Sequence, residues 1–583
     1  MTEEDRVPER RLSALLRTLN SDAILSAAVF LISFLHLIQF CGSLDVRGIA
    51  DEGYSLDVVQ RMFYGELIYK DFFVAQTPLS VIILRYLVFP VFGTTLLAAR
   101  ASIAFIGGAM AALTYKMARS LGMHWLLALY PPFLFVFFGF HNWNNVSHHW
   151  FSMLFVLLGI YLLQSNILKP SRAYKLFLSG ICGGLAFLSL QSDGFLFLAS
   201  IAVFLPLRKM TFWETVRDVF LFGLGIAFSL SVFLIFLFLN ARTFPGYTSY
   251  LSLLKTIFYN CMILPFGEYN RFNALPQYYY FGNQIIADLF HSMVSPASFK
   301  EFLFSLFGLP VAASFGYAPF PALIFSAIYL YPRRNNLNKK TQGLLLLSVI
   351  CLVFILGAIL TRPDPLRLIF ISPVTFALFF LFLEKGLLIS SPPPLARGGI
   401  KGGIFSVKLI CSLLFFIFGV ATIVWGASWA YSLSKYHRIE VKVPRGTIVF
   451  SDPIKAAELS SLNRFINSKT KEGDYLYIHG WSPQYYFLLN RRNPTSYDLL
   501  IPVLYSHSQI EDAVSQIEAK KPRYVLYDGK VESLMQDPAK NTFPTLTPDD
   551  LKDNPMVPYI HSHYKPVMSF LSLGLAILER RSP

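Results

Sequence analysis

Long apolar runs separated by short polar loops constrain the fold of this sequence more than any other feature. A helix needs about 20 apolar residues to cross a bilayer, and by this measure we count about eleven candidate spans. They lie near residues 22–42, 96–118, 124–139, 149–168, 174–191, 194–208, 216–240, 304–331, 341–360, 366–388 and 405–430. Only 15% of the 583 residues are charged, whereas a soluble domain carries about 25%. The sequence therefore predicts an α-helical multi-pass membrane protein.

Basic residues in the loops predict the orientation of these spans. Lysine and arginine gather in alternate loops, for example around Lys116, Arg119 and Arg333, and the intervening loops are richer in acids, amides and histidine. Because cytoplasmic loops carry the excess of positive charge, we expect a cytoplasmic N-terminus and an extracytoplasmic C-terminal region. The same bias accounts for the net charge of +15. No arginine-rich arm interleaved with aromatic residues indicates a nucleic-acid partner, so membrane lipids are the expected surroundings.

The composition changes after residue 430, where charges return and apolar runs shorten. Asp452 followed by Pro453 is a typical helix start. Residues 475–480 and 523–529 have the composition of strands, and the apolar run near 567–578 is expected to form a closing strand. Strands that alternate with helices predict a small α/β domain.

These features divide the chain into a membrane domain over residues 1–430 and an extracytoplasmic α/β domain over residues 431–583. Two extracytoplasmic loops of the membrane domain are long, at 43–95 and 241–303. Residues 389–404 are rich in proline and glycine, and we expect a disordered cytoplasmic insert there.

The first long loop places two adjacent carboxylates, Asp51 and Glu52, where the chain leaves its first span. Residues 54–65 have the apolar spacing of a helix that lies in the membrane interface. Residues 77–93 predict a second interfacial helix, which we expect to break at Pro90. Such a loop would form a structured cap that holds carboxylates at the membrane surface. The plainer alternative is that this acidic pair only solvates a helix end.

The loop "ADEGYSLDVVQRMFYGELIYKDFFVAQTPL" and the "FG" and "AAR" that follow it resemble the first outer loop of GT-C glycosyltransferases. The resemblance is to the branch that uses polyprenyl-phosphate sugars, which includes protein O-mannosyltransferases, aminoarabinose lipid A transferases and lipopolysaccharide-core transferases. The matching residues are Asp51, Glu52, Gly65, Tyr69, Asp71, Pro78, Leu79, Gly93 and Arg100.

This resemblance implies a GT-C fold in the plasma membrane, which in a bacterium is the inner membrane. It also implies a glycosyltransferase that moves a hexosyl or pentosyl group from an undecaprenyl- or dolichyl-type phosphate. The acceptor would be an extracytoplasmic glycolipid, polysaccharide or protein. One departure is the sequence Gln76-Thr77-Pro78, where lipid A transferases have Glu-Lys-Pro. The missing lysine, which helps to hold the donor phosphate in those enzymes, argues against a lipid A acceptor.

The residues fit this chemistry. The acceptor hydroxyl must lose a proton as it attacks the sugar, and a carboxylate within hydrogen-bond reach contributes roughly 10²–10⁴-fold. We assign that base to Asp51, with Glu52 either orienting it or capping the helix. The resemblance adds Asp71 to the catalytic carboxylates and assigns Tyr69 and Gln76 to substrate binding.

The leaving phosphate needs cations or hydrogen-bond donors. Candidates are Arg100 near the outer end of its span, Arg362 and Arg367 in an outer turn, and Lys255 and Arg271 in the loop 241–303. Arginines at span ends can equally extend to the interface without binding a ligand.

The stretch "FHNWNNVSHHW" (140–150) adds His141, His148, His149 and three amides at the outer surface. Imidazole is a common metal ligand, but this spacing defines no ligand set. We therefore expect an interfacial cluster in which His148 touches the substrate. No cofactor is certain, and a divalent cation is possible.

Three other functions are alternatives to a polyprenyl-phosphate-sugar transferase. An oligosaccharide transferase or ligase could have the same architecture. A lipid or glycan transporter is expected to bury charges near the middle of its spans and to contain internal repeats; the sequence has neither. A non-catalytic assembly subunit could keep the fold without being an enzyme. Unchanged turnover in a variant without the Asp51 carboxylate would favour the transporter or the subunit over the enzyme.

Overall fold

The structure is a computed structural model, and its side chains are described for most but not all of the residues placed in helices. It describes residues 21–42, 49–72, 74, 76–140, 144–168, 174–208, 211–242, 318–334, 337–361, 365–388, 409–410, 412–422, 424, 428, 438–498, 500, 507–528 and 554–581. Most of the predicted loop 241–303 and the whole predicted insert 389–404 lie outside these residues.

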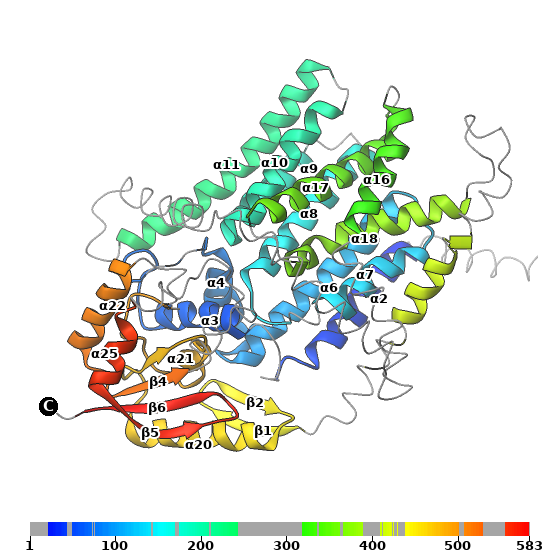
Figure 1. Cartoon of the computed structure of the whole chain (residues 1–583). Coiled ribbons are helices and arrows are strands. Elements are labelled where there is room, and N and C mark those ends of the chain that lie inside the picture. Colours follow the sequence, from blue (N-terminus) through cyan, green and yellow to red (C-terminus); the bar gives the residue numbers. More distant parts are fainter. Residues whose placement is uncertain are drawn as a thin grey trace, which may run out of the picture.

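A bundle of apolar helices forms the larger part of the molecule (Figure 1). Its helices are α2 (Ser21–Ile38), α6 (Leu96–Ser120), α7 (Tyr130–Leu134), α8 (His148–Leu168), α9 (Tyr174–Ser189), α10 (Gln191–Leu207), α11 (Phe212–Arg242), α16 (Pro319–Leu330), α17 (Lys339–Thr361) and α18 (Pro365–Leu388).

Five described helical stretches are long and apolar enough to cross a membrane: Leu96–Ser120, His148–Leu168, Phe212–Leu239, Lys339–Gly357 and Leu368–Lys385. Each predicted span overlaps a described helix, although several of these are shorter, such as Tyr174–Ser189 and Ser412–Thr422. The mostly helical membrane fold is therefore confirmed, and the count of about eleven spans stays a prediction.

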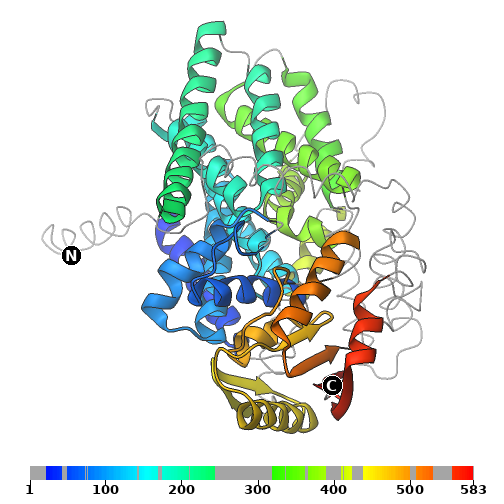
Figure 2. The same cartoon turned by 90° about the vertical axis from the view of Figure 1, so that its left-hand side faces the viewer.

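The bundle has a central and a peripheral helix that differ sharply in burial. The apolar window of α18 is 89% buried, whereas that of α11 is 22% buried. Helix α11 lies at the edge of the bundle (Figure 2). Large apolar side chains on it, such as Phe220 and Ile235, are exposed. A helix that is apolar on all sides and exposed at the edge is suited to contact lipid.

The first loop folds into helices whose bounds differ from those predicted. Helix α3 covers Ile49–Phe63, so Asp51 and Glu52 lie within its first turn and not in a segment before it. The polar residues Asp57, Gln60 and Arg61 are as buried as the apolar ones, at 0–2% exposed. Helix α3 therefore has protein on several sides, and its place in the membrane interface stays a prediction.

The second helical segment of this loop continues through Pro90. It consists of α4 (Leu79–Ile83), a π-helical turn (Leu84–Val88) and α5 (Phe89–Phe92). Proline is tolerated near a helix start, where its missing N–H would have no helical partner. Because the π-helical turn ends just before Pro90, the predicted break does not occur. The segment ends at Gly93, whose φ of 85° favours glycine.

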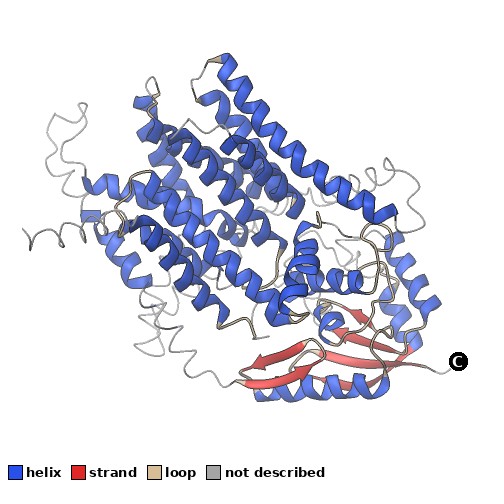
Figure 3. Ribbon diagram, turned by 180° about the vertical axis from the view of Figure 1, so that it is seen from behind, coloured by secondary structure: helices blue, strands red, loops and turns tan. Residues whose placement is uncertain are grey.

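The C-terminal layer, which we define as the described residues from 438 to 581, contains two sheets (Figure 3). Strands β1 (Ile439–Val443) and β2 (Gly446–Phe450) form an antiparallel hairpin. The larger sheet has the order β3-β4-β6-β5. The strands of this sheet are β3 (Tyr477–His479), β4 (Tyr524–Asp528), β5 (Tyr564–Phe570) and β6 (Leu575–Arg580). The helices of the C-terminal layer are α20 (Pro453–Lys469), α21 (Gln484–Leu488), α22 (His507–Lys520) and α25 (Met556–His563).

Strand β3 pairs parallel with β4, while β4 with β6 and β5 with β6 are antiparallel. The predicted helix start is confirmed, because the Asp452 side chain accepts a hydrogen bond from the N–H of Ile454 at 2.8 Å. The single closing strand expected near 567–578 is wrong. A turn at residues 571–574 divides this run into β5 and β6, and Gly574 has a φ of 72°.

Helix α3 lies between the bundle and the C-terminal layer (Figures 1 and 3). Its contact with α21 is a close approach of two backbones. A Cβ atom on Gly53 would lie 2.5 Å from the backbone nitrogen of Gln484, which is closer than any side chain permits. Glycine at this position therefore lets the C-terminal layer pack directly against α3.

Candidate functional site

A buried ion pair fixes the first turn of α3 to the bundle. Glu52 accepts hydrogen bonds from Arg100 Nε at 2.7 Å and from Arg100 Nη2 at 2.5 Å. Both side chains are fully buried. The backbone N–H of Val146, in the segment before α8, donates to the same carboxylate at 3.1 Å. Bidentate pairing of this kind is strong and geometrically specific.

These contacts occupy Glu52 and Arg100 with each other. Arg100 lies in the first turns of α6, where the Thr95 side chain accepts a hydrogen bond from the N–H of Ala98 at 3.1 Å and caps the helix. Asp51 precedes Glu52 in the same turn of α3, and its side chain is outside the described residues. The ion pair thus determines where the backbone of Asp51 lies.

The loop-one turn that contains Gln76 and Thr77 is anchored to the corner between α9 and α10. The Thr77 hydroxyl donates to the carbonyl oxygen of Phe187 at 2.7 Å. The Thr77 N–H donates to the Gln191 side chain at 3.1 Å. The Thr77 side chain therefore anchors the loop to the bundle.

Tyr69 holds the preceding turn of the loop. It adopts a φ of 65°, which is uncommon for a residue other than glycine. Its hydroxyl donates to the carbonyl oxygen of Gln76 at 3.1 Å. Asp71 is exposed, and its carboxylate accepts a hydrogen bond from the N–H of Leu67 at 2.8 Å. The structure therefore places Tyr69 and Asp71 in the turn of the loop.

Two histidines begin α8. His148 is buried at 7% exposed, whereas the side chains of His149 and Asp193 are each 14% exposed. Nδ1 of His149 lies 3.3 Å from Oδ2 of Asp193, which is in the first turn of α10. Asn144, in the segment before α8, donates to the carbonyl oxygen of Leu37 at 3.1 Å. The polar residues at this end of α8 thus lie between α2, α3 and α10.

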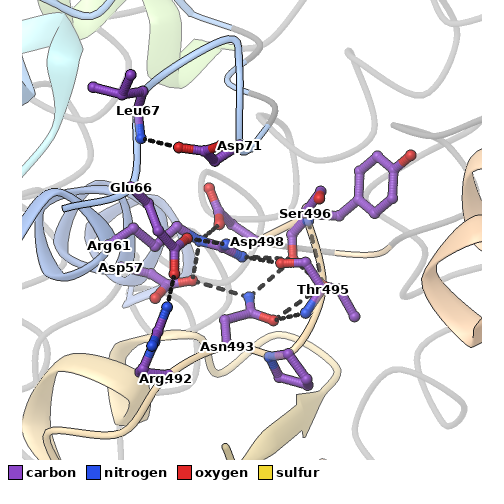
Figure 4. A network of polar contacts seen from close by, with 12 residues as sticks. Asp57, Arg61, Glu66, Leu67, Asp71, Arg492, Asn493, Thr495, Ser496 and Asp498 are labelled. Atoms are coloured by element: carbon purple, nitrogen blue, oxygen red, sulfur yellow. Dashed lines mark hydrogen bonds and ion pairs between the residues drawn. The ribbon is translucent and has the colours of Figure 1, made fainter. Parts of the chain in front are cut away.

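A second buried network fixes the C-terminal half of α3 to the C-terminal layer (Figure 4). Arg61 lies at its centre, with Nε 2.6 Å from the Asp498 carboxylate and 3.6 Å from the Asp57 carboxylate. Nη1 of Arg61 donates to Glu66 at 3.0 Å, and Nη2 donates to the carbonyl oxygen of Thr495 at 2.7 Å.

Two further contacts extend this network. Arg492 contacts Glu66 at 3.1 Å, and the amide of Asn493 donates to Asp57 at 3.2 Å. Burial raises the pKa of Asp57 well above its usual value, Arg61 lowers it and the nearby Asp498 raises it further. Burial also raises the pKa of Asp498. The two carboxyls therefore take up a proton more readily than an exposed pair.

The remaining predicted residues are placed only in part. Arg367 lies in the first turn of α18, and its side chain is outside the described residues. Arg362, Lys255 and Arg271 lie wholly outside them. Their assigned roles stay predictions. Sequence reasoning assigned no role to Arg61, Asp193 or Asp498, because their partners are far away along the chain.

Among the residues that the structure describes, no group of three or more His, Cys, Asp or Glu side chains is placed to hold a metal ion. The possible divalent cation therefore stays a prediction, and no ligand set for it is assigned.

Comparison with solved structures identifies the fold class as GT-C. ArnT from Cupriavidus metallidurans bound to undecaprenyl phosphate matches with a TM-score of 0.54 and 11% identity, over 96% of this chain and 98% of that one. The apo state of the same protein gives a TM-score of 0.55 and 13% identity, over 95% and 97% of the two chains.

The apo oligosaccharyltransferase of Archaeoglobus fulgidus matches with a TM-score of 0.51 and 12% identity, over 93% of this chain and 73% of that one. No protein-family model matches the sequence, and no curated protein matches it. These neighbours are GT-C glycosyltransferases. The resemblance found in loop one is therefore confirmed as a shared fold, which at these identities is what the likeness shows.

Proposed function

We propose that this protein is an integral-membrane glycosyltransferase that transfers a sugar from a polyprenyl phosphate to an extracytoplasmic acceptor. One observation carries the proposal. The ion pair of Glu52 with Arg100, joined by the N–H of Val146, fixes the turn of α3 that also contains Asp51. Support comes from the shared fold with ArnT, whose structure holds undecaprenyl phosphate.

In the proposed reaction, the Asp51 carboxylate accepts the proton of the acceptor hydroxyl as its oxygen bonds to C1 of the sugar. The bond between C1 and the phosphate oxygen breaks, and its electron pair stays on the phosphate. Glu52 is buried and paired, so we assign it to positioning the helix, together with Arg100. Tyr69, Asp71 and Gln76 lie in the turns of loop one. His148 lies at the start of α8, two residues after Val146, and we keep its assignment to substrate binding.

The proposed placement follows from the loop charges. The N-terminus lies in the cytoplasm, about eleven helices cross the plasma membrane, and residues 431–583 form an extracytoplasmic α/β domain above the reaction site. In this arrangement α3 and the C-terminal layer both lie on the outer side. The acceptor is an extracytoplasmic glycan, lipid or protein, and the donor sugar is a hexose or a pentose.

The replacement Asp51→Asn tests the proposal, because it removes the base and keeps the side-chain shape. A deletion strain is expected to accumulate a polyprenyl-phosphate sugar, and the wild-type gene should clear it. In membranes, we expect Asp51→Asn to lower the transfer rate by roughly 10²–10⁴-fold.

The matched control is Asp452→Asn, because asparagine caps a helix about as well as aspartate and Asp452 lies at the exposed start of α20. This control should keep the wild-type rate. A fully active Asp51→Asn variant would reject the proposed base and favour a transporter or an assembly subunit. A deletion strain with no accumulated sugar lipid would reject the donor class.

A further inference from the structure

His149 and Asp193 form a polar contact that is built from two helices and is partly open. The side chains come from the first turns of α8 and α10. Nδ1 of His149 lies 3.3 Å from the carboxylate, and each side chain is 14% exposed. Within the described part of the chain, no lysine or arginine forms an ion pair with this carboxylate. The pair is therefore buried enough to be fixed in position and open enough to meet a ligand.

Packing fixes the orientation of both side chains. The His149 ring stacks on the ring of Phe370, with centroids 4.3 Å apart and planes at 13°. Asp193 precedes Gly194, where a Cβ atom would lie 2.2 Å from the Cα of Phe187. Glycine is required there because α9 and α10 meet at a close corner. Neither side chain depends on a mobile loop for its position.

Each member of the pair follows closely on a residue that binds loop one. Val146, whose N–H binds Glu52, is three residues before His149. Gln191, which binds the Gln76–Thr77 turn, is two residues before Asp193. The helix ends that carry the pair therefore also carry the groups that bind the first turn of α3 and the Gln76–Thr77 turn.

The proposed reaction needs a cation or hydrogen-bond donor at the donor phosphate. The donor phosphate is a singly charged diester, and it gains a second negative charge when the bond to the sugar breaks. Arg100 cannot meet that need, because it is fully buried and bound to Glu52. Hydrogen-bond donors aimed at developing charge in a site that excludes water give the largest stabilisation.

We propose that His149, oriented by Asp193, is a catalytic residue that holds the phosphate of the donor. This inference rests on the proposed function. The two ring nitrogens point away from each other, so an imidazolium that donates Nδ1–H to Asp193 presents Nε2–H to a phosphate oxygen. No proton is transferred in this role. The hydrogen bond strengthens as charge builds on the phosphate, while the proton of the acceptor goes to Asp51.

A purely structural pair would behave differently. Its function would be to join α8 to α10, and a glutamine in place of His149 would still donate a hydrogen bond to Asp193. Binding of an anion, in contrast, depends on the positive charge that only the imidazolium supplies. The ratio of the affinity for a polyprenyl phosphate to the affinity for the uncharged polyprenol therefore distinguishes a phosphate-binding role of His149 from a purely structural one.

The experiment compares binding of a polyprenyl phosphate and of the polyprenol of equal chain length to the purified full-length protein. Wild-type protein should prefer the phosphate. We expect His149→Gln to lower the affinity for the phosphate about 10-fold, which corresponds to one charge-assisted hydrogen bond, and to leave the affinity for polyprenol unchanged. Asp193→Asn should act in the same direction.

The matched control is His507→Gln, because His507 also pairs with a carboxylate, Glu511, at 3.2 Å, but on the exposed face of α22. It should keep the wild-type preference. If wild-type protein shows no preference for the phosphate, the donor class of the proposed function fails. If wild-type protein prefers the phosphate and both His149→Gln and Asp193→Asn keep the full preference, this inference is overturned. If His149→Gln does not fold, the preference of Asp193→Asn decides.

Discussion

Arg61 is the residue whose removal should separate α3 from the C-terminal layer. The replacement Arg61→Met keeps most of the side-chain length and removes the charge. It leaves Asp57, Glu66 and Asp498 without the guanidinium that lies 3.6, 3.0 and 2.6 Å from them. It also removes the donors to the carbonyl oxygens of Thr495 and Tyr497, at 2.7 and 3.3 Å.

The size of the effect follows from burial. Removing one partner of a buried ion pair costs about 3–5 kcal/mol, because the other charge stays buried without compensation. The Asp57 and Asp498 pair takes up a proton readily, since burial raises both pKa values. Protonation relieves part of the cost, so we expect about 3 kcal/mol. For a unit the size of the C-terminal layer, this corresponds to a drop of roughly 6–12 °C in apparent Tm.

The assay is thermal unfolding of the purified protein in detergent. Arg523→Met is the matched control, because Arg523 pairs with Glu579 at 2.9 Å with side chains 60% and 28% exposed. An exposed pair contributes at most about 1 kcal/mol, so its Tm should change little.

A double variant identifies the pair responsible. Adding Asp498→Asn to Arg61→Met should recover part of the loss, with a coupling energy of about 0.5–3 kcal/mol. Equal Tm values for Arg61→Met and Arg523→Met would refute the reasoning. Strict additivity in the double variant would do so as well.

Two further predictions concern the same helix. Gly53→Ala should separate α3 from α21, because the new Cβ would lie 2.5 Å from the backbone nitrogen of Gln484. We expect the free energy of unfolding to fall by about 1–3 kcal/mol, with a lower Tm. In Gly223→Ala the new Cβ would meet no described atom within 4 Å, so its Tm should match that of wild type. Stability should also depend on pH through Asp57 and Asp498, whose folded-state pKa values are raised by burial. The contribution of these two carboxyls to folding stability is complete below the unfolded pKa of about 3.9 and is lost as pH rises through the raised folded-state pKa values. We therefore expect Tm to fall between pH 4 and pH 8, and to fall less in Asp57→Asn. A Tm that rises with pH would contradict this prediction.

The sequence predicted those helices, helix caps and strands that are determined by residues close to one another along the chain. Apolar runs long enough to span a bilayer became the bundle helices, such as α6 and α17. Asp452 caps α20 as a residue of its type should. The strand predicted at 523–529 is β4 (Tyr524–Asp528), because four aromatic or aliphatic residues follow one another between Pro522 and Gly529. In each case the signal lies within about ten residues.

The differences arise where polar residues find partners across the fold. The helix was predicted to begin at residue 54, although α3 already includes Glu52, whose partner Arg100 is 48 residues away. No role was predicted for Arg61, which donates to Thr495, 434 residues away. No periodicity in a single sequence reports such a partner.

The two polar networks assign different roles to the two ends of α3. Its first turn is fixed by Arg100 of α6 and by the backbone of Val146, both in the bundle. Its last turns are fixed by Asp498 and Thr495 of the C-terminal layer. A helix held at both ends by different parts of the molecule has its position only when both parts are in place. The turn that contains Asp51 therefore depends on a layer that contributes no residue to the proposed chemistry. In the proposed function, the two networks together position the turn of α3 that contains Asp51, one from the bundle and one from the C-terminal layer.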